Sequence, residues 1–147
     1  MKVLFDACVV IDIMMRSAWA VDAFASYDIC QIRQYDVLVP VESTTDIAYV
    51  LHRRGFSKAE TCEALAVIMD MFTLCDTIHA DAQAANESAM DDYEDALIAF
   101  SAARNGVDLV VTRNVKDFAK SPVKAITPKQ FVETFCPPDI SYSEIAF

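Results

Sequence analysis

Five short apolar stretches alternate with longer segments whose apolar residues recur every three or four positions. The short stretches predict buried strands at residues 2–5, 36–40, 72–75, 107–112 and 123–126. The longer segments between them predict helices, and parallel neighbouring strands need such crossover connections. The alternation therefore predicts an α/β fold: a single three-layer α/β/α domain with a mostly parallel sheet of four to five strands.

Capping signals mark where several of the helices begin and end. Ser57 and Glu60 have the spacing of a capping box, and Thr127, followed by a proline and later a glutamine, has the same features. Gly55 and Gly106 each follow a helical segment and tolerate the left-handed conformation that ends a helix. Helices are expected to begin close to residues 9, 18, 43, 57, 80, 93 and 127, and the segment that begins at 80 is expected to run to 90.

The chain has the size of one ordinary domain, with 147 residues, 54% of them hydrophobic. Residues 1–136 are expected to form the domain, and residues 137–147, which begin with two prolines, an extended tail on its surface. No segment reaches the roughly 18 uninterrupted apolar residues of a membrane span. Asp6 and Asp12 interrupt the region where a signal peptide would be apolar. We expect a cytoplasmic protein with no membrane partner.

Cysteine, histidine and glycine exclude several kinds of site. The five cysteines are odd in number, scattered, and form no CxxC pair, which argues against a disulfide framework or a zinc site. Most are expected to be reduced and buried. The two histidines are too few for a histidine-centred catalytic site, and two glycines cannot form a glycine-rich phosphate loop.

Aspartates gather where the predicted strands end. Asp6 follows the first strand directly, Asp46 lies just beyond the second, and Asp117 follows the strand at 107–112. Asp92 and Asp95 begin the helix before that strand and share one helix face. Ligands of open α/β sheets bind at the carboxyl ends of the strands. Carboxylates brought together repel each other unless a cation neutralises them, and oxygen ligands favour Mg²⁺ or Mn²⁺. Such a site suits phosphodiester hydrolysis.

Each acid also has a simpler interpretation. Asp46, Asp92 and Asp95 could be acids that the helix macrodipole favours in a first turn, and Asp117 could be a turn residue. Asp6 is harder to explain in this way, because a carboxylate that ends a buried strand needs partners.

The net charge of −10 argues against a nucleic-acid partner, since phosphate binding depends on Lys and Arg. Residues 113–129, however, hold five basic residues and one acid. Arg113, Lys116 and Lys120 within this segment are candidates to bind RNA phosphates. A solvated basic loop is the alternative.

Four stretches, at residues 3–12, 44–49, 92–106 and 109–118, together resemble the motifs of the PIN-domain family of ribonucleases. The resemblance is strongest to the toxins of VapBC-type toxin–antitoxin pairs, and it covers nearly the whole chain. It implies metal-dependent RNA cleavage that leaves a 5′-phosphate, usually by a homodimer, and an antitoxin partner that blocks the site.

The resemblance also implies roles for particular residues. The acidic quartet would be Asp6, Asp46, Asp95 and Asp117. The metal ligands would be Asp6, Asp95, Asp117 and Asp92. Asn114 would be a catalytic residue, and Asp92 and Asn114 would orient the quartet or its water.

Near the proposed quartet, one residue competes with Asp46 and two depart from the family motif. Glu42 lies closer to the second strand than Asp46, but Asp46 matches the motif better. Family members commonly carry Thr and Asn after the first acid, where this chain has Ala7 and Cys8. A hydroxyl and an amide that could hold Asp6 or a water are therefore missing from these positions.

Three functions compete on these grounds. The first is a metal-dependent endoribonuclease, the toxin of a type II toxin–antitoxin pair. The second, favoured by Ala7, Cys8 and the charge of −10, is a catalytically weak or inactive PIN-like interaction module. The third is a phospho-acceptor receiver domain, for which Asp76 is a poor acceptor candidate.

Overall fold

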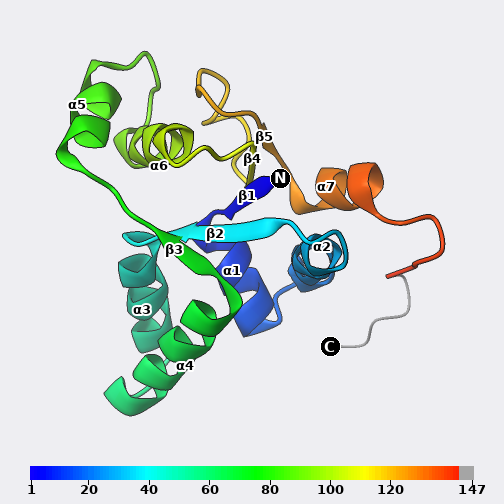
Figure 1. The fold of residues 1–147 in the computed structure, drawn as a ribbon. Helices are drawn as coiled ribbons and strands as arrows, with labels where there is room; N and C mark the ends of the chain where they lie inside the picture. The colour runs from blue at the N-terminus through cyan, green and yellow to red at the C-terminus, as the bar shows by residue number, and fades with distance from the viewer. Residues whose placement is uncertain (143–147) are drawn as a thin grey trace.

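A parallel sheet of five strands forms the centre of the protein in a computed structural model that describes residues 1–142 (Figure 1). The strands are β1 (Lys2–Phe5), β2 (Asp36–Pro40), β3 (Thr73–Cys75), β4 (Leu109–Val111) and β5 (Ala125–Ile126). Their order across the sheet is β3-β2-β1-β4-β5, and every neighbouring pair is parallel. Strands β1 and β4 lie at its middle, so residues that follow these two strands emerge side by side.

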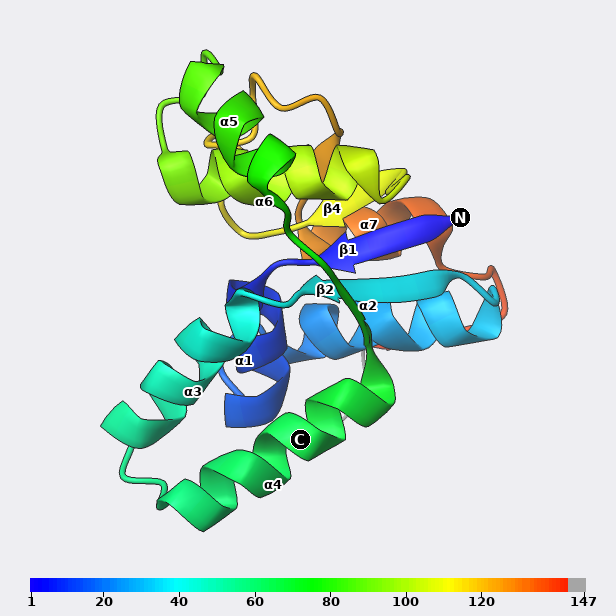
Figure 2. The same cartoon turned by 60° about the vertical axis from the view of Figure 1, so that its left-hand side comes forward.

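Helices cover both faces of this sheet. They are α1 (Ala7–Met15), α2 (Ala20–Ile32), α3 (Ser43–Arg53), α4 (Lys58–Met71), α5 (His79–Glu87), α6 (Tyr93–Arg104) and α7 (Pro128–Phe135). Helices α5 and α6 lie together on one face, and the others lie on the opposite face (Figure 2). The predicted three-layer α/β/α architecture with a mostly parallel sheet is confirmed.

The side chains of β1 alternate between two hydrophobic clusters. Val3 and Phe5 belong to the larger cluster with α1, α2, α3, α4 and α7, whereas Leu4 belongs to the smaller cluster with α6. All three are fully buried. Complete burial of one such side chain contributes about 1.5–3 kcal/mol, so β1 is anchored from both faces. The residue after β1 is therefore held in a well-defined place.

The predicted capping signals are present. The Ser57 Oγ accepts a hydrogen bond from the Glu60 N–H at 3.3 Å, and the Glu60 carboxylate accepts one from the Ser57 N–H at 2.8 Å. Thr127 caps α7 in the same manner. Gly55 and Gly106 follow α3 and α6 with φ angles of 92° and 72°, in the left-handed region.

Two helix boundaries differ from the sequence prediction. Helix α1 begins at Ala7 rather than Val9, because Asp6 keeps an extended conformation (φ −66°, ψ 151°) and takes the N-cap position. Helix α5 ends at Glu87 rather than Met90, because Ser88 turns extended. The first difference places Asp6 at the end of a strand and the start of a helix at once.

Other expectations can be compared with the described part of the chain. All five cysteines are free, but the expectation that most are buried is wrong: Cys30 and Cys75 are buried, Cys8 and Cys136 are half-buried, and Cys62 is exposed. In residues 1–142 no helix is both long and apolar enough to cross a membrane. Within the predicted tail, the buried Tyr142 donates a hydrogen bond to Asp28 on α2 at 2.7 Å. The rest of that tail, residues 143–147, lies outside the described residues.

Candidate active site

Asp6 is held at the carboxyl end of the sheet by β4 and the residue that follows it. The register pairs Phe5 with Val111, and the Asp6 N–H donates to the Val111 carbonyl at 3.0 Å. Asp6 therefore lies beside Thr112, whose Oγ1 donates to the Asp6 Oδ2 at 2.6 Å. The same Thr112 oxygen accepts the Asn114 N–H at 3.0 Å. Asp6 is only 7% exposed, and this hydroxyl supplies a partner that a buried carboxylate needs.

Cys8 also contacts Asp6, which bears on the departure from the family motif at Ala7 and Cys8. The Cys8 Sγ donates to the Asp6 Oδ2 at 3.0 Å. Burial, and then the nearby charge of Asp6, raise the pKa of the Cys8 thiol to about 11. The thiol therefore keeps its proton and remains a donor. Cys8 and Thr112 together hold Asp6, a role that the sequence analysis assigned to neither.

An open cavity of about 430 Å³ lies beyond the ends of β1 and β4. Most of the predicted site residues line it, together with several that the sequence analysis did not single out for this site. The lining includes Asp6, Asp92, Asp95, Asp117 and Asn114, and also Ala7, Cys8, Ile11, Val50, Glu94 and Arg113. Four predicted carboxylates thus share one cavity.

The first turn of α6 brings three acids to this cavity. Asp92 is the N-cap residue, and its Oδ1 accepts the N–H groups of Glu94 at 2.9 Å and Asp95 at 3.1 Å. Asp92 therefore caps α6 and lines the cavity at the same time. Burial, followed by the charges of Asp6, Asp92, Asp117 and Glu94, raises the pKa of the Asp95 carboxyl to about 7. Negative charge therefore exceeds positive charge around this cavity.

Asp46 lies next to the cavity without lining it. It is in the first turn of α3, and Val50, one turn further along, does line the cavity. Burial raises the pKa of Glu94, and the charge of Asp46 raises it further, so these two carboxylates are neighbours. Glu42, the rival for the second acid, accepts a hydrogen bond from the Thr77 Oγ1 at 2.7 Å.

Sequence reasoning missed Glu94 and Thr112, although signals for both were present. Glu94 lies between two predicted site residues in the first turn of the same helix. Thr112 directly follows β4, which is the position that Asp6 has after β1, but the predicted strand at 107–112 included it.

The predicted RNA-binding residues have three different settings. Arg113 lines the cavity, and its Nε lies 3.2 Å from the Oδ2 of the buried Asp12. That contact is an ion pair without hydrogen-bond geometry. Lys116 is exposed on the loop after β4 and does not line the cavity. Lys120 pairs with Asp91 at 3.1 Å.

The chemistry of the cavity fits a hard divalent cation, because the donors are carboxylates and an amide and the Asp95 carboxyl is forced toward its neutral form. Within residues 1–142, no group of three or more His, Cys, Asp or Glu side chains could hold a metal ion as it stands.

The protein is an α/β domain with a parallel sheet and a polar cavity beyond its central strands, which is where open α/β sheets bind ligands. The sequence pattern of the PIN domain matches residues 2–116, and the chain belongs to the PIN-domain family. This match includes every predicted site residue except Asp117 and Lys120.

Solved structures share the fold. One is VapBC2 from Rickettsia felis bound to a DNA fragment from its promoter, at 13% identity and a TM-score of 0.66, covering 86% of this chain and 98% of that one. FitAB bound to an IR36 DNA fragment has 16% identity and a TM-score of 0.69, with coverage of 86% and 94%. VapBC-1 from nontypeable Haemophilus influenzae has 12% identity and a TM-score of 0.64, with coverage of 88% and 99%. A comparison with curated protein sequences finds no significant match.

Proposed function

We propose that this protein is a divalent-metal-dependent endoribonuclease and the toxin of a type II toxin–antitoxin pair. The observation that carries the proposal is the cavity where Asp6, Asp92, Asp95 and Asp117 meet and where the pKa of Asp95 rises to about 7. Unpaired carboxylates cost stability unless a ligand compensates them, so their presence favours a functional role.

The residues proposed to hold Mg²⁺ or Mn²⁺ are Asp6, Asp95, Asp117 and Asp92, with Asp46 acting through Glu94. A bound divalent cation supplies the polarisation of a phosphoryl oxygen and the lowered pKa of a water that phosphodiester hydrolysis needs. In residues 1–142, both side-chain hydrogen bonds to Asp6 go to Oδ2, which leaves Oδ1 available for a ligand. Thr112 fixes the orientation of the Asp6 carboxylate by its bond to Oδ2, because the Thr112 hydroxyl is itself oriented by the Asn114 N–H.

Three basic residues are proposed to hold the RNA backbone. Arg113 lies at the wall of the cavity, and its pairing with Asp12 keeps the guanidinium there. Lys116 and Lys120 are on the loop that follows, where they reach solvent. Phosphate contacts of this kind position the nucleic acid without reading its sequence.

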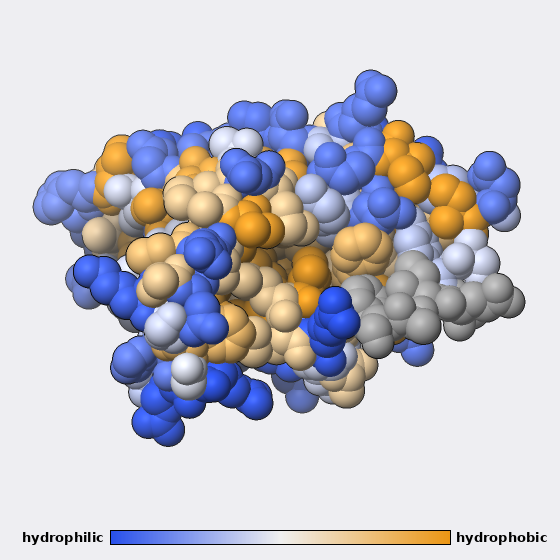
Figure 3. Space-filling model, turned by 90° about the horizontal axis from the view of Figure 1, so that it is seen from below, coloured by the Kyte–Doolittle hydropathy of each residue, from blue (hydrophilic) through white to orange (hydrophobic). Residues whose placement is uncertain are grey.

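An antitoxin and a second copy of this chain are the proposed protein partners. The support for an antitoxin is that the solved structures with this fold include complexes described as VapBC2, VapBC-1 and FitAB. The face beneath the sheet shows apolar side chains surrounded by hydrophilic ones (Figure 3). Tyr49 on α3 and Val67 and Met69 on α4 are large apolar or aromatic side chains exposed to solvent. Exposed apolar patches of this kind favour a protein partner.

The test compares the unaltered protein with Asp6→Asn. Structured and single-stranded RNA are incubated with each protein in Mg²⁺, in Mn²⁺ and in EDTA. We expect cleavage that leaves 5′-phosphates, needs the cation and disappears in the variant. Equal behaviour of the two folded proteins would contradict the nuclease proposal and favour a PIN-like interaction module.

A further inference from the structure

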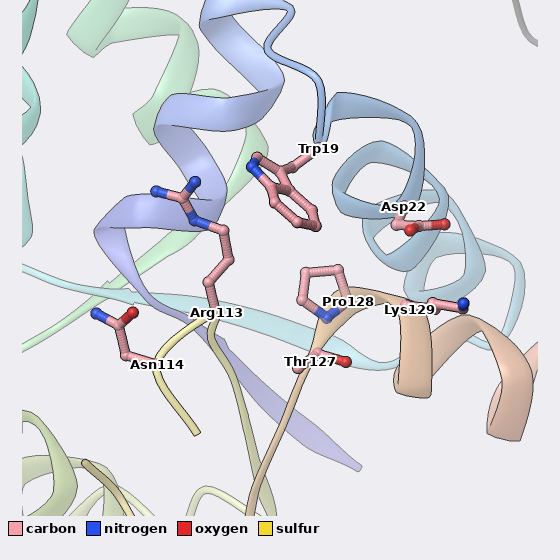
Figure 4. A pocket seen from close by; sticks show the side chains of 7 residues that line it. All are labelled: Trp19, Asp22, Arg113, Asn114, Thr127, Pro128 and Lys129. Atoms are coloured by element: carbon pink, nitrogen blue, oxygen red, sulfur yellow. The ribbon is translucent and has the colours of Figure 1, made fainter. Parts of the chain in front are cut away.

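A second cavity, of about 480 Å³, adjoins the acidic one. Arg113 and Asn114 line both cavities, so the two share a wall. The segments that enclose the second cavity come from the start of α2, the loop after β4 and the start of α7 (Figure 4). Its full lining is Trp19, Asp22, Arg113, Asn114, Thr127, Pro128 and Lys129.

Trp19 gives this cavity an aromatic wall. It is the only tryptophan of the chain and is 58% exposed, which is unusual for so large an apolar side chain. It occupies the N-cap position of α2 but makes no side-chain capping bond, so capping does not account for it. Figure 4 shows the indole ring directed toward Pro128 and beside the Arg113 side chain. A flat group could lie against the indole at this place.

A continuous set of contacts holds Trp19 and Arg113 in place. The backbone N–H of Trp19 donates to the Ser17 Oγ at 3.1 Å, and that hydroxyl donates to the Asp12 Oδ1 at 2.6 Å. The other carboxylate oxygen of Asp12 lies 3.2 Å from the Arg113 Nε. Asp12 is buried, so the carboxylate at the centre of this connection is shielded from solvent. The backbone of Trp19 and the Arg113 guanidinium are therefore connected through Asp12, and both residues line the same cavity.

The charge around this cavity suits an anionic polymer. The lining holds two basic residues, Arg113 and Lys129, and one acid, Asp22, in a chain whose net charge is −10. Two further polar residues that line the cavity are Asn114 and Thr127. The Thr127 hydroxyl accepts the Gln130 N–H at 3.1 Å and still has its own proton to donate. Such a combination of aromatic, cationic and hydrogen-bonding groups is what unpaired bases of RNA bind.

We propose that this second cavity binds an unpaired nucleobase of the RNA, adjacent to the phosphodiester that the acidic cavity cleaves. The base stacks on Trp19, Arg113 and Lys129 contact the phosphates on its two sides, and Asn114 and Thr127 form hydrogen bonds with its edge. The inference rests on the proposed function for the nature of the polymer. It adds a place on this chain, at Trp19, for the base next to the cleaved bond.

The single tryptophan allows a direct test. Its fluorescence is followed while a six-nucleotide single-stranded RNA is added to Asp6→Asn in Mg²⁺ and to the unaltered protein in EDTA, so that the RNA stays intact. The control ligand is a six-unit abasic ribose–phosphate chain, which has the same charge but no bases. We expect quenching by the RNA and little by the abasic chain. Equal effects of the two ligands, or none from either, would overturn the proposal and leave the cavity to a protein partner.

Variants of Trp19 provide a second measurement. Binding of labelled RNA is compared for Trp19→Ala, Trp19→Phe and Met69→Ala, a control on α4 that removes a side chain of similar exposure (53%). We expect Trp19→Ala to weaken binding by about 5- to 150-fold, since stacking of one base on an aromatic ring has that effect. Trp19→Phe should retain most of the affinity and Met69→Ala all of it. Unchanged binding by Trp19→Ala would contradict the inference.

The two proposals can fail separately. RNA that quenches Trp19 but is never cleaved by the unaltered protein would contradict the nuclease proposal and support the base site. If Trp19→Ala cleaves RNA with the same KM and kcat as the unaltered protein, that result would support the nuclease proposal and contradict the base site.

Discussion

Carboxylates at the two ends of α6 have opposite electrostatic surroundings. At the last turn, Arg104 pairs with Asp81 at 2.9 Å and with Asp76 at 2.9 Å. Its hydrogen bond holds the pKa of Asp76 below the usual range. At the first turn, Asp95 faces other acids, and its pKa rises to about 7 through burial and their repulsion. The same residue type is supplied with a counter-charge at one end of the helix and left without one at the other.

We interpret the difference as a separation between acids that stabilise the fold and acids that are proposed to bind a ligand. Both ends agree with the helix macrodipole, which favours acids at the start and bases at the end, so the dipole does not separate them. What separates them is the counter-charge. Asp81, whose side chain is only 4% exposed, receives one from within the chain. Within residues 1–142 no ion pair joins a cavity acid to a basic side chain, and a cation is proposed to take that role.

The largest expected effect is on activity at the first turn. Asp95→Asn should lower RNA cleavage at least about 100-fold, because loss of a group that merely orients a metal ligand already costs about 10- to 100-fold. Initial rates with Mg²⁺ measure this. Asp81→Asn, at the other end of α6, is the matched control and should cleave at the normal rate below its melting temperature. Equal losses of cleavage rate in Asp95→Asn and Asp81→Asn would contradict the distinction between the two ends of α6.

The hydroxyl that holds Asp6 should matter next. Thr112→Val keeps the shape of a fully buried side chain but removes the donor to Asp6 and the acceptor for the Asn114 N–H. We expect cleavage to fall about 10- to 100-fold and metal affinity with it. Thr112→Ser, which retains the hydroxyl, should restore most of the rate. Loss of activity in both variants would indicate a packing role instead.

Asp81 should matter for stability rather than activity. Asp81→Asn weakens the contacts of a buried carboxylate with Arg104 and with the Ile78 N–H. The free energy of unfolding, measured by urea denaturation, should fall by roughly 2 kcal/mol, as hydrogen bonds to charged groups are worth about 1.5–3 kcal/mol. Asp76→Asn, at an exposed site, should have little effect. A larger loss for Asp76→Asn would contradict this order.

The smallest effect concerns pH. The Asp95 pKa is higher in the folded protein than in the unfolded chain, so its ionisation opposes folding. This cost is absent below the unfolded pKa, near 4, and grows as the pH rises through about 7. Without metal, the melting temperature should fall between pH 5 and pH 8, less steeply in Asp95→Asn. Mg²⁺ or Mn²⁺ should raise it again at pH 8. A variant with the same slope as the unaltered protein would contradict this account.

The sequence determined most of the fold, for local reasons. Apolar runs such as residues 107–112 are long enough to identify a strand, and the Ser57 and Thr127 caps mark helix starts within one residue. The alternation of strand and helix then restricts the sheet to parallel connections. Boundaries failed where one backbone conformation decides them, as at Asp6, which extends the strand and caps α1.

The candidate site could be anticipated only in part. The rule that ligands bind beyond the strand ends was sufficient to select Asp6, Asp92, Asp95 and Asp117, which the structure brings to one cavity. It could not show that Asp46 meets the cavity through Glu94, because that contact joins two helices far apart in the chain.

Only the tertiary structure decided which partners each acid has. The β1–β4 register brings Thr112 to Asp6 across 106 positions of sequence, and the packing of α5 on α6 brings Arg104 to Asp81. The same is true of the second cavity, where Trp19 and Arg113 meet although the chain separates them widely. Residue type determines what an acid or a ring can do. Its neighbours, which depend on long-range packing, determine the pKa and the ligand.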